Sequence, residues 1–253
     1  MAVRNRQIGW SPMANALYDV LREFNAIKGQ IAATTTSTTT ITIDSTVRVD
    51  LGGQEAFFDI PFSKCSFGCW INTTNSVGFP RIFSFGQYPS AYQAISIEND
   101  ILYVWYNGNI AMTFDLSQTS YIGNWVWIAL QGSTTGDIGL WIDGVNVIST
   151  TISSPGIPTT EMFMGSENAP NTYYDGLMAG IVFDGGDIDV TIVPTVPIVP
   201  QGTTRLLLGQ GGSLTEQLTD LGIYGLQVIN TNCTYSTESP YTPADGGSIK
   251  FGA

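Results

Sequence analysis

The stretch at residues 123–148, GNWVWIALQGSTTGDIGLWIDGVNVI, decides the fold class. Three short apolar runs at 125–130, 139–142 and 145–148 are typical of β-strands in length and in their share of branched and aromatic residues. Asp143-Gly144 separates the last two runs, and this pair favours the two-residue turn of a hairpin because both of its positions need a positive φ. The stretch therefore predicts antiparallel β-structure.

Runs of the same kind fill the chain on both sides of this stretch. They predict strands at 41–43, 47–49, 57–60, 67–71, 82–85, 95–97, 101–106, 110–114, 162–164, 177–183, 190–193, 205–208, 224–229 and 248–251. Asn107-Gly108 predicts a further hairpin turn, the proline-rich 193–200 an edge or a loop, and 209–222 one helical turn or a loop. Repeated short strands joined by tight turns predict an all-β sandwich or jelly roll.

The first 33 residues carry the strong helical signal of the chain. Ser11-Pro12 predicts a helix start, with serine as the N-cap and proline at the first helical position. The apolar residues after it are spaced by four and three positions, as in the seam of a coiled coil. This stripe consists of Met13, Leu17, Val20, Phe24, Ile27 and Ile31.

Two interpretations of the stripe stay open: it packs on its own β-domain, or it packs against copies of itself. The threonine-rich run at 34–40 favours self-association, because a polar tether without core-forming residues separates a helix from its domain. We therefore predict an arm and oligomerising helix at 1–33, a linker and first strand at 34–43, and a jelly-roll sandwich at 44–253. The apolar residues of the seam do not choose between two and three helices.

Charge is scarce and unevenly distributed. Charged residues make up 12% of the chain and the net charge is −12. Four bases and two acids give residues 1–33 a charge of +2, so the remainder carries −14. Such an acidic body repels phosphate backbones, and we expect no nucleic-acid binding. No apolar stretch approaches the roughly 18 residues of a membrane span, so we expect no membrane insertion, and no signal peptide is visible.

The chain contains no histidine and three cysteines. The lack of histidine excludes Ser-His-Asp and Cys-His machinery and imidazole metal sites. Cys65 and Cys69 lie four positions apart on a predicted strand, roughly 13 Å at about 3.3 Å per residue, which is too far for a disulfide. With Cys233 the count is odd, so we expect buried free thiols, which are compatible with assembly in a reducing cytoplasm.

Five segments in order carry a resemblance to a known fold family: FGCWI at 67–71, ISI with LY at 95–103, GNWVWIAL at 123–130, LWIDG at 140–144 and YDGLMAGI at 174–181. Together they resemble the laminin-G-like, concanavalin-A-like jelly-roll superfamily. The chain departs from that pattern at Val126-Trp127, where two histidines are frequent, and at Ala179-Gly180, where Asp-Glu is frequent. Because this fold carries lectins, hydrolases and viral coat parts, the resemblance implies the fold more than the function.

The N-terminal segment, RQIGWS at 6–11 followed by ALY at 16–18, resembles the start of phage virion proteins that place an arm and a helix ahead of a β-domain. The resemblance implies a non-enzymatic virion protein, a capsid decoration, head fibre or tail fibre. It implies a homotrimer that is assembled in the host cytoplasm and bound to capsid or tail proteins, with Arg4, Arg6 and Trp10 as the anchor. The alternative is a host-glycan-binding lectin, and a polysaccharide-active enzyme is the least favoured class.

Two groups of aromatic residues in turns and loops are candidates for glycan binding, because exposed rings with polar neighbours suit sugars. Trp105, Tyr106 and Asn107 lie at a predicted hairpin tip, and Tyr173 and Tyr174 lie in an asparagine-rich loop. Packing in the core is the competing interpretation, since only alternate residues of a strand face outward.

Acidic residues offer one candidate metal site and no catalytic pair. Asp184, Asp187 and Asp189 surround a glycine turn and are candidates for binding calcium, although solvated turn acids are the competing interpretation. The E-x-D-x-x-E strand of this fold's glycoside hydrolases does not occur. We therefore expect a protein without enzymatic activity and, calcium aside, without a cofactor.

Overall fold

The computed structural model describes residues 45–74, 80–87, 90–117, 119–156, 159–166, 173–241 and 246–252. These ranges make up the β-domain. The predicted arm, the coiled-coil seam and the threonine-rich linker lie outside them, and so do the anchor residues Arg4, Arg6 and Trp10.

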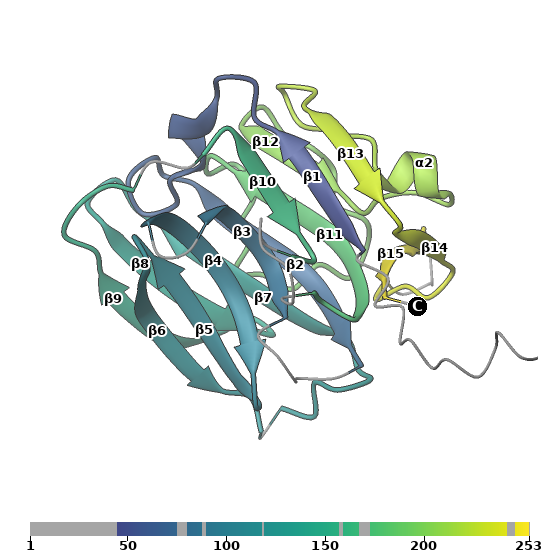
Figure 1. Ribbon diagram of the computed structural model, residues 1–253, viewed down its shortest axis with the longest axis horizontal. Helices are drawn as coiled ribbons and strands as arrows, with labels where there is room; N and C mark the ends of the chain where they lie inside the picture. Colours follow the sequence, from purple (N-terminus) through teal and green to yellow (C-terminus); the bar gives the residue numbers. More distant parts are fainter. Residues whose placement is uncertain are drawn as a thin grey trace, which may run out of the picture. The chain divides into compact units, whose positions relative to one another are not determined.

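Two antiparallel sheets pack face to face (Figure 1). The strands of sheet A, in spatial order, are β13 (Gln227–Thr231), β1 (Thr46–Asp50), β10 (Glu161–Met164), β3 (Arg81–Gln87), β4 (Ser90–Glu98), β5 (Ile101–Tyr106) and β6 (Asn109–Asp115). Those of sheet B are β14 (Thr234–Ser236), β15 (Ser248–Phe251), β11 (Gly176–Asp184), β2 (Ser66–Thr73), β7 (Val126–Gly132), β8 (Asp137–Ile142) and β9 (Val145–Thr151), with β12 (Thr204–Leu208) paired to β11. The predicted all-β sandwich is confirmed.

Tight turns set the register of the hairpins, as their sequences predict. Asn107-Gly108 joins β5 to β6 and Asp143-Gly144 joins β8 to β9, and all four residues have φ between 47° and 78°. Asn99-Asp100 joins β4 to β5 in the same way, with φ of 49° and 66°. Asparagine, aspartate and glycine tolerate this left-handed conformation at low cost, which is why these pairs mark the turns.

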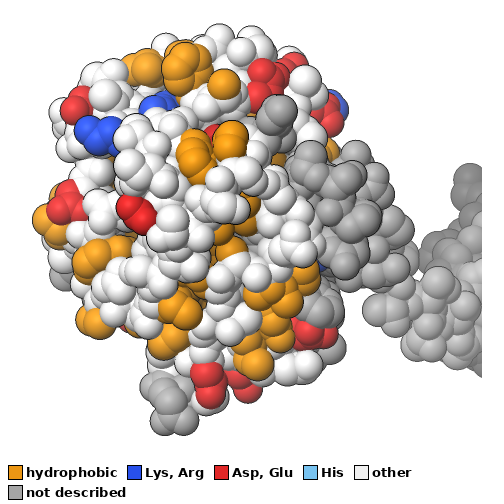
Figure 2. All heavy atoms as spheres, turned by 90° about the vertical axis from the view of Figure 1, so that its left-hand side faces the viewer, with side chains coloured by type: hydrophobic (Ala, Val, Ile, Leu, Met, Phe, Trp, Pro, Cys, Tyr) orange, Lys and Arg blue, Asp and Glu red, His pale blue; other side chains and the backbone are white. Residues whose placement is uncertain are grey.

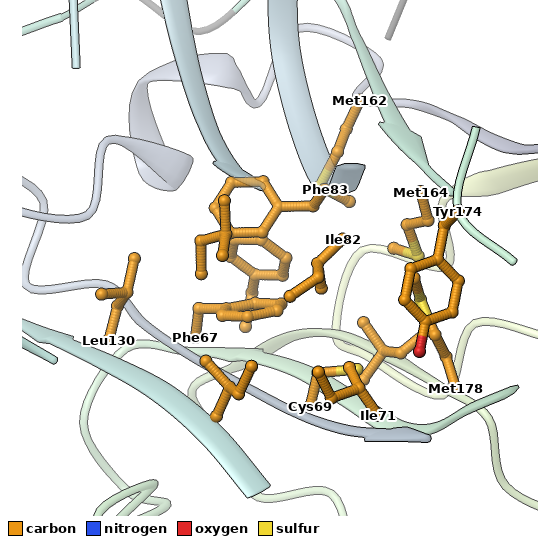
Figure 3. Close-up of a cluster of buried hydrophobic side chains, with 14 of the residues drawn as sticks. Phe67, Cys69, Ile71, Ile82, Phe83, Leu130, Met162, Met164, Tyr174 and Met178 are labelled. Carbon is orange, nitrogen blue, oxygen red and sulfur yellow. The ribbon is translucent and has the colours of Figure 1, made fainter. Parts of the chain in front are cut away.

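The main core lies between the sheets and is rich in phenylalanine and methionine. Figure 3 shows side chains of β3 and β10 meeting those of β2, β7 and β11. Phe67 and Phe183 of sheet B lie 4.5 and 5.5 Å from Phe83 of sheet A, measured between ring centroids. Offset and edge-on contacts of this kind add to the gain from burying the rings and fix the spacing of the two sheets.

A second, smaller core covers the outer face of sheet B. Trp127 on β7 is 1% exposed and packs on Trp70 of β2, with the two ring centroids 5.7 Å apart. The indole Nε1 of Trp127 donates to the backbone oxygen of Val190 at 2.8 Å. This bond holds the loop that follows β11 over the outer face of sheet B. β2 is therefore buried on both faces, and Trp127 is a core residue.

Two predicted strands take other conformations. Residues 57–60 overlap a 3₁₀ helix, η1 (Glu55–Phe58), which turns the chain so that Phe58 enters the core. Residues 190–193 form a turn, because the bond from Trp127 and a backbone bond from Ile192 to Asp189 bend this β-branched run. The loop at 209–222 contains one short helix, α2 (Leu214–Gln217), and β14 was not predicted.

Charged groups are sparse on the face shown in Figure 2. Most of it is white, the colour of the backbone and of uncharged polar side chains, with hydrophobic patches between, and acidic groups are more frequent there than basic ones. Cys65, Cys69 and Cys233 are buried and free, as expected, and burial raises the pKa of Cys65 and Cys233 to about 12. Among the described residues, no helix is long and apolar enough to cross a bilayer.

Candidate functional site

A cleft of about 720 Å³, the polar cleft, lies where β2 ends and β11 begins. It falls in the size range of small-ligand sites, about 300–1,000 Å³. Its lining combines carboxylates, an ammonium, an amide, hydroxyls and one phenol, carried by Asn72, Thr74, Asp175, Tyr235, Thr237, Glu238 and Lys250. These residues come from elements far apart in the chain, so the fold, and no local motif, brings them together.

Strand register places the polar side chains of the cleft on one face. Lys250 of β15 pairs with Leu177 of β11, and Leu177 pairs with Asn72 of β2. Directly paired residues project from the same side of a sheet, and their neighbours along each strand project from the other. Ile249 and Phe251 therefore enter the core while Lys250 faces outward.

Two glycines allow close contacts at the edge of the cleft: Gly176 lies against the Asn72 backbone, and Gly252 lies against the Asp175 carboxylate. A Cβ on Gly176 (φ +150°) would lie 2.3 Å from the backbone oxygen of Asn72, and one on Gly252 (φ +85°) would lie 2.3 Å from Oδ1 of Asp175. The hydroxyls of Thr73 and Thr74 donate to the backbone oxygen of Asp175 at 3.2 and 3.1 Å. The position of the Asp175 carboxylate is thus set by its backbone and by a close glycine.

The polar cleft combines charges of both signs. Lys250 forms no ion pair with any residue in the part of the chain that the structure describes, although Asp175 and Glu238 line the same cleft. The backbone of Glu238 is fixed, since its oxygen accepts from the Ser248 hydroxyl at 2.8 Å and its N–H donates to Ser236 Oγ at 3.2 Å. The cleft therefore holds one ammonium donor and two carboxylates on a rigid frame.

A second cleft of about 490 Å³, the aromatic cleft, lies at the other end of β2. Its lining includes Phe57, Phe62 and Pro155 together with the carboxylate of Asp59. Asp59 is 4% exposed and accepts the Tyr106 hydroxyl at 2.6 Å. Burial raises the pKa of Asp59, and the hydrogen bond from Tyr106 opposes that shift.

The first predicted group of sugar-binding residues, Trp105, Tyr106 and Asn107, lies beside the aromatic cleft. Its two rings do not form an exposed surface there. Tyr106 is 6% exposed, contrary to the expectation, because its hydroxyl is drawn inward by Asp59. Trp105 is half-buried, and its Nε1 donates to Ser96 Oγ at 2.9 Å. Asn107 occupies the tight turn after β5.

The second predicted group, Tyr173 and Tyr174, lies next to the polar cleft, but the Tyr174 ring points into the core and away from the cleft. Tyr174 is 1% exposed, also contrary to the expectation, and it packs edge-on against Phe251 with centroids 5.8 Å apart. Tyr173 is half-buried. The following residue, Asp175, lines the cleft. The sequence signal at Asp175 is its pairing with Gly176, the first residue of β11, and an Asp-Gly pair is equally typical of a turn.

The proposed calcium ligands do not converge. Asp184 is fully buried, and its Oδ1 accepts from the N–H groups of Gly186, Asp187 and Ile188 at 2.6–2.9 Å. Its carboxylate also accepts the hydroxyls of Thr203 and Thr204. Asp187 and Asp189 are exposed. Within the described ranges, no group of three or more His, Cys, Asp or Glu side chains is placed to hold a metal ion.

Solved structures share this architecture. A Bacteroides ovatus protein provisionally described as a carbohydrate binding protein superposes with a TM-score of 0.50 at 12% identity, over 77% of this chain and 62% of that one. Domains LG4-5 of the mouse laminin α1 chain match with a TM-score of 0.43 at 10% identity, over 60% and 44% of the two chains. The fold is a laminin-G-like jelly roll.

A third similar structure is the ligand binding domain of botulinum neurotoxin serotype D in complex with N-acetylneuraminic acid, with a TM-score of 0.44 at 19% identity over 59% of this chain and 39% of that one. The chain thus spans less than two thirds of the length of each of these structures. No protein-family model matches the sequence, and the comparison with curated proteins finds no match. At these identities the likeness shows the sandwich fold alone.

Proposed function

We propose that this laminin-G-like domain is a non-enzymatic carbohydrate-binding module and that the polar cleft holds the sugar. The observation that carries the proposal is the convergence of Asn72, Asp175, Glu238 and Lys250 on one cleft. The similar fold of the Bacteroides ovatus protein supports it at the level of architecture.

The chemistry of the cleft matches that of a sugar. Each sugar hydroxyl both donates and accepts, so its recognition needs fixed acceptors and fixed donors close together. Asp175 and Glu238 supply acceptors, Lys250 supplies a donor, and the Asn72 amide supplies both. Tyr235 adds a ring whose hydroxyl is already engaged with the Gly246 backbone oxygen at 3.2 Å, which fixes its orientation.

A glycan array followed by calorimetry on the full chain tests this proposal. Lys250→Ala and Glu238→Gln should each weaken binding of the best array ligand at least about tenfold, since a lost hydrogen bond to a charged group costs roughly 1.5–3 kcal/mol. Lys64→Ala is the matched control, because Lys64 is exposed and does not line the cleft. Affinities within twofold of the wild type for both variants, or an array without hits above a control β-protein, would refute the site.

A second function is favoured by the sequence of residues 1–33. The arm with Arg4, Arg6 and Trp10 and the apolar stripe from Met13 to Ile31 suit a chain that is anchored at one end and assembled into trimers. We propose that the chain is a phage virion protein that displays its β-domain outward from the capsid or tail. Mass spectrometry of particles purified from the phage that encodes the chain should detect it, and its absence would refute this role.

A further inference from the structure

The aromatic cleft has exposed ring surface from Phe57, the same ring that Arg205 and Tyr224 contact. Phe57 is 46% exposed on η1, and Phe62 and Pro155 stand around the same cleft. In a chain whose large apolar residues are mostly buried, a half-exposed phenylalanine beside a cleft of about 490 Å³ offers a flat apolar wall to a ligand.

A carboxylate lies at the base of this apolar wall. Asp59 is almost fully buried, yet it lines the cleft. Its carboxylate accepts the Tyr106 hydroxyl at 2.6 Å, whereas a carboxylate has about four lone-pair positions. Asp59 can therefore accept a further donor from a ligand that rests on Phe57. Few polar groups within a mostly apolar lining are typical of small-molecule sites.

Arg205 determines the charge of that ligand. Its guanidinium lies over the Phe57 ring at 5.7 Å and donates to the backbone oxygens of Phe57 and Ser63. The arginine thus holds the loop before β2 in place and takes the cation–π position on the ring. Because Arg205 and Asp59 balance each other in charge, the cleft favours a neutral ligand that carries hydroxyl donors over a cation.

We propose that the aromatic cleft is a second carbohydrate site, which takes one neutral pyranose ring. The C–H face of the sugar lies on Phe57, since the negative face of an aromatic ring attracts weakly positive C–H groups, and one sugar hydroxyl donates to Asp59. This site deepens the proposed function and rests on it, because it assumes that the domain binds sugars. The two clefts lie at opposite ends of β2, so one subunit can bind two sugar units at once.

Two backbone amides report on the two clefts separately. Gly156 lines the aromatic cleft and Gly176 lines the polar cleft. The full chain, labelled with ¹⁵N-glycine, is titrated with the methyl glycosides of glucose, galactose, mannose and N-acetylglucosamine while both amide signals are followed. We expect at least one sugar to shift the Gly156 signal saturably. Phe57→Ala should abolish that shift, and Lys250→Ala should leave it intact.

The matched control is Ile110→Ala, which removes a comparably exposed apolar side chain (50%) from β6, outside both clefts. It should leave the Gly156 shift unchanged. A shift at Gly176 without one at Gly156 would overturn the second site while the proposed function stands. A Gly156 shift that survives Phe57→Ala would also overturn it. If neither signal moves with any of the four sugars, the second site is wrong, and the glycan array decides the proposed function.

Discussion

Asp59 ties together three segments that are distant in sequence, and its ionisation acts against folding. Burial raises its pKa in the folded protein above the value in the unfolded chain, about 3.9. The folded state therefore binds this proton more tightly. The corresponding stabilisation is complete below the unfolded pKa and is lost as pH rises through the folded pKa.

We predict that Asp59→Asn is more favourable for stability at pH 7 than at pH 3, relative to the wild type. The amide keeps an acceptor for Tyr106 but does not ionise. Guanidinium unfolding of both proteins at the two pH values measures the difference. Asp187→Asn, at an exposed carboxylate, serves as the control. An identical stability difference at both pH values would contradict the role of burial.

At the scale of elements, β2 depends on a glycine that faces a tryptophan. A Cβ on Gly68 would lie 2.3 Å from the Trp127 ring, closer than real Cβ contacts allow. We predict that Gly68→Ala destabilises the protein by about 1–3 kcal/mol, the usual cost of overpacking. Gly202→Ala is the control, since its Cβ would meet nothing closer than 3.5 Å. Denaturant unfolding measures the stability of both variants. Equal midpoints for Gly68→Ala and Gly202→Ala would show that the Trp127 ring moves aside at no cost.

The turn after β11 is organised by the side chain of Asp184. Asp184 accepts five hydrogen bonds from its own chain while fully buried. We predict that Asp184→Asn lowers the free energy of unfolding by at least about 2 kcal/mol. The amide nitrogen replaces an oxygen that accepts hydrogen bonds, and as a donor it faces N–H and hydroxyl groups that are donors too. Chelation with EDTA should leave the melting midpoint of the wild type unchanged. A lower midpoint on chelation would restore the calcium hypothesis.

Local sequence patterns predicted the elements that have local causes. The hairpin turns at Asn107-Gly108 and Asp143-Gly144 depend on two residues each, and both are confirmed. The run at 190–193 was mispredicted because its conformation is imposed by the indole of Trp127, 63 positions away. Propensity gives way to tertiary contacts in such cases.

The candidate site was harder to predict than the fold, because contacts between residues that are distant in sequence create it. Asn72, Asp175 and Lys250 meet only through the pairing of three strands that are distant in sequence. Tyr174 was a candidate for sugar binding because of its aromatic ring. Asp175 was not a candidate for sugar binding, since a polar residue before Gly176 is also typical of a plain turn. The polar cleft thus needed the strand order and the register, which no short pattern contains.

At the scale of the whole molecule, we propose that the β-domain binds glycan and that residues 1–33 assemble the chains. The N-terminal segment carries +2 and the remainder −14, so copies of the β-domain repel one another, and the apolar stripe is the seam that we propose holds them together. If the seam forms, several clefts on one assembly bind a glycan-coated surface jointly. Multivalent binding of this kind can exceed single-site affinity by about 10²–10⁴.

We predict that Phe24→Asp converts the assembly into monomers of 27.3 kDa, because a charge in the seam must be buried without a partner. Light scattering measures the mass. Asn25→Asp, which adds the same charge beside the stripe, should leave the oligomer intact. Calorimetry with a single glycan should give equal affinity for both variants, while binding to a glycan-coated surface should fall at least about a hundredfold for Phe24→Asp alone. An oligomer that withstands Phe24→Asp would mean that the stripe packs elsewhere, and joint binding would then need another route.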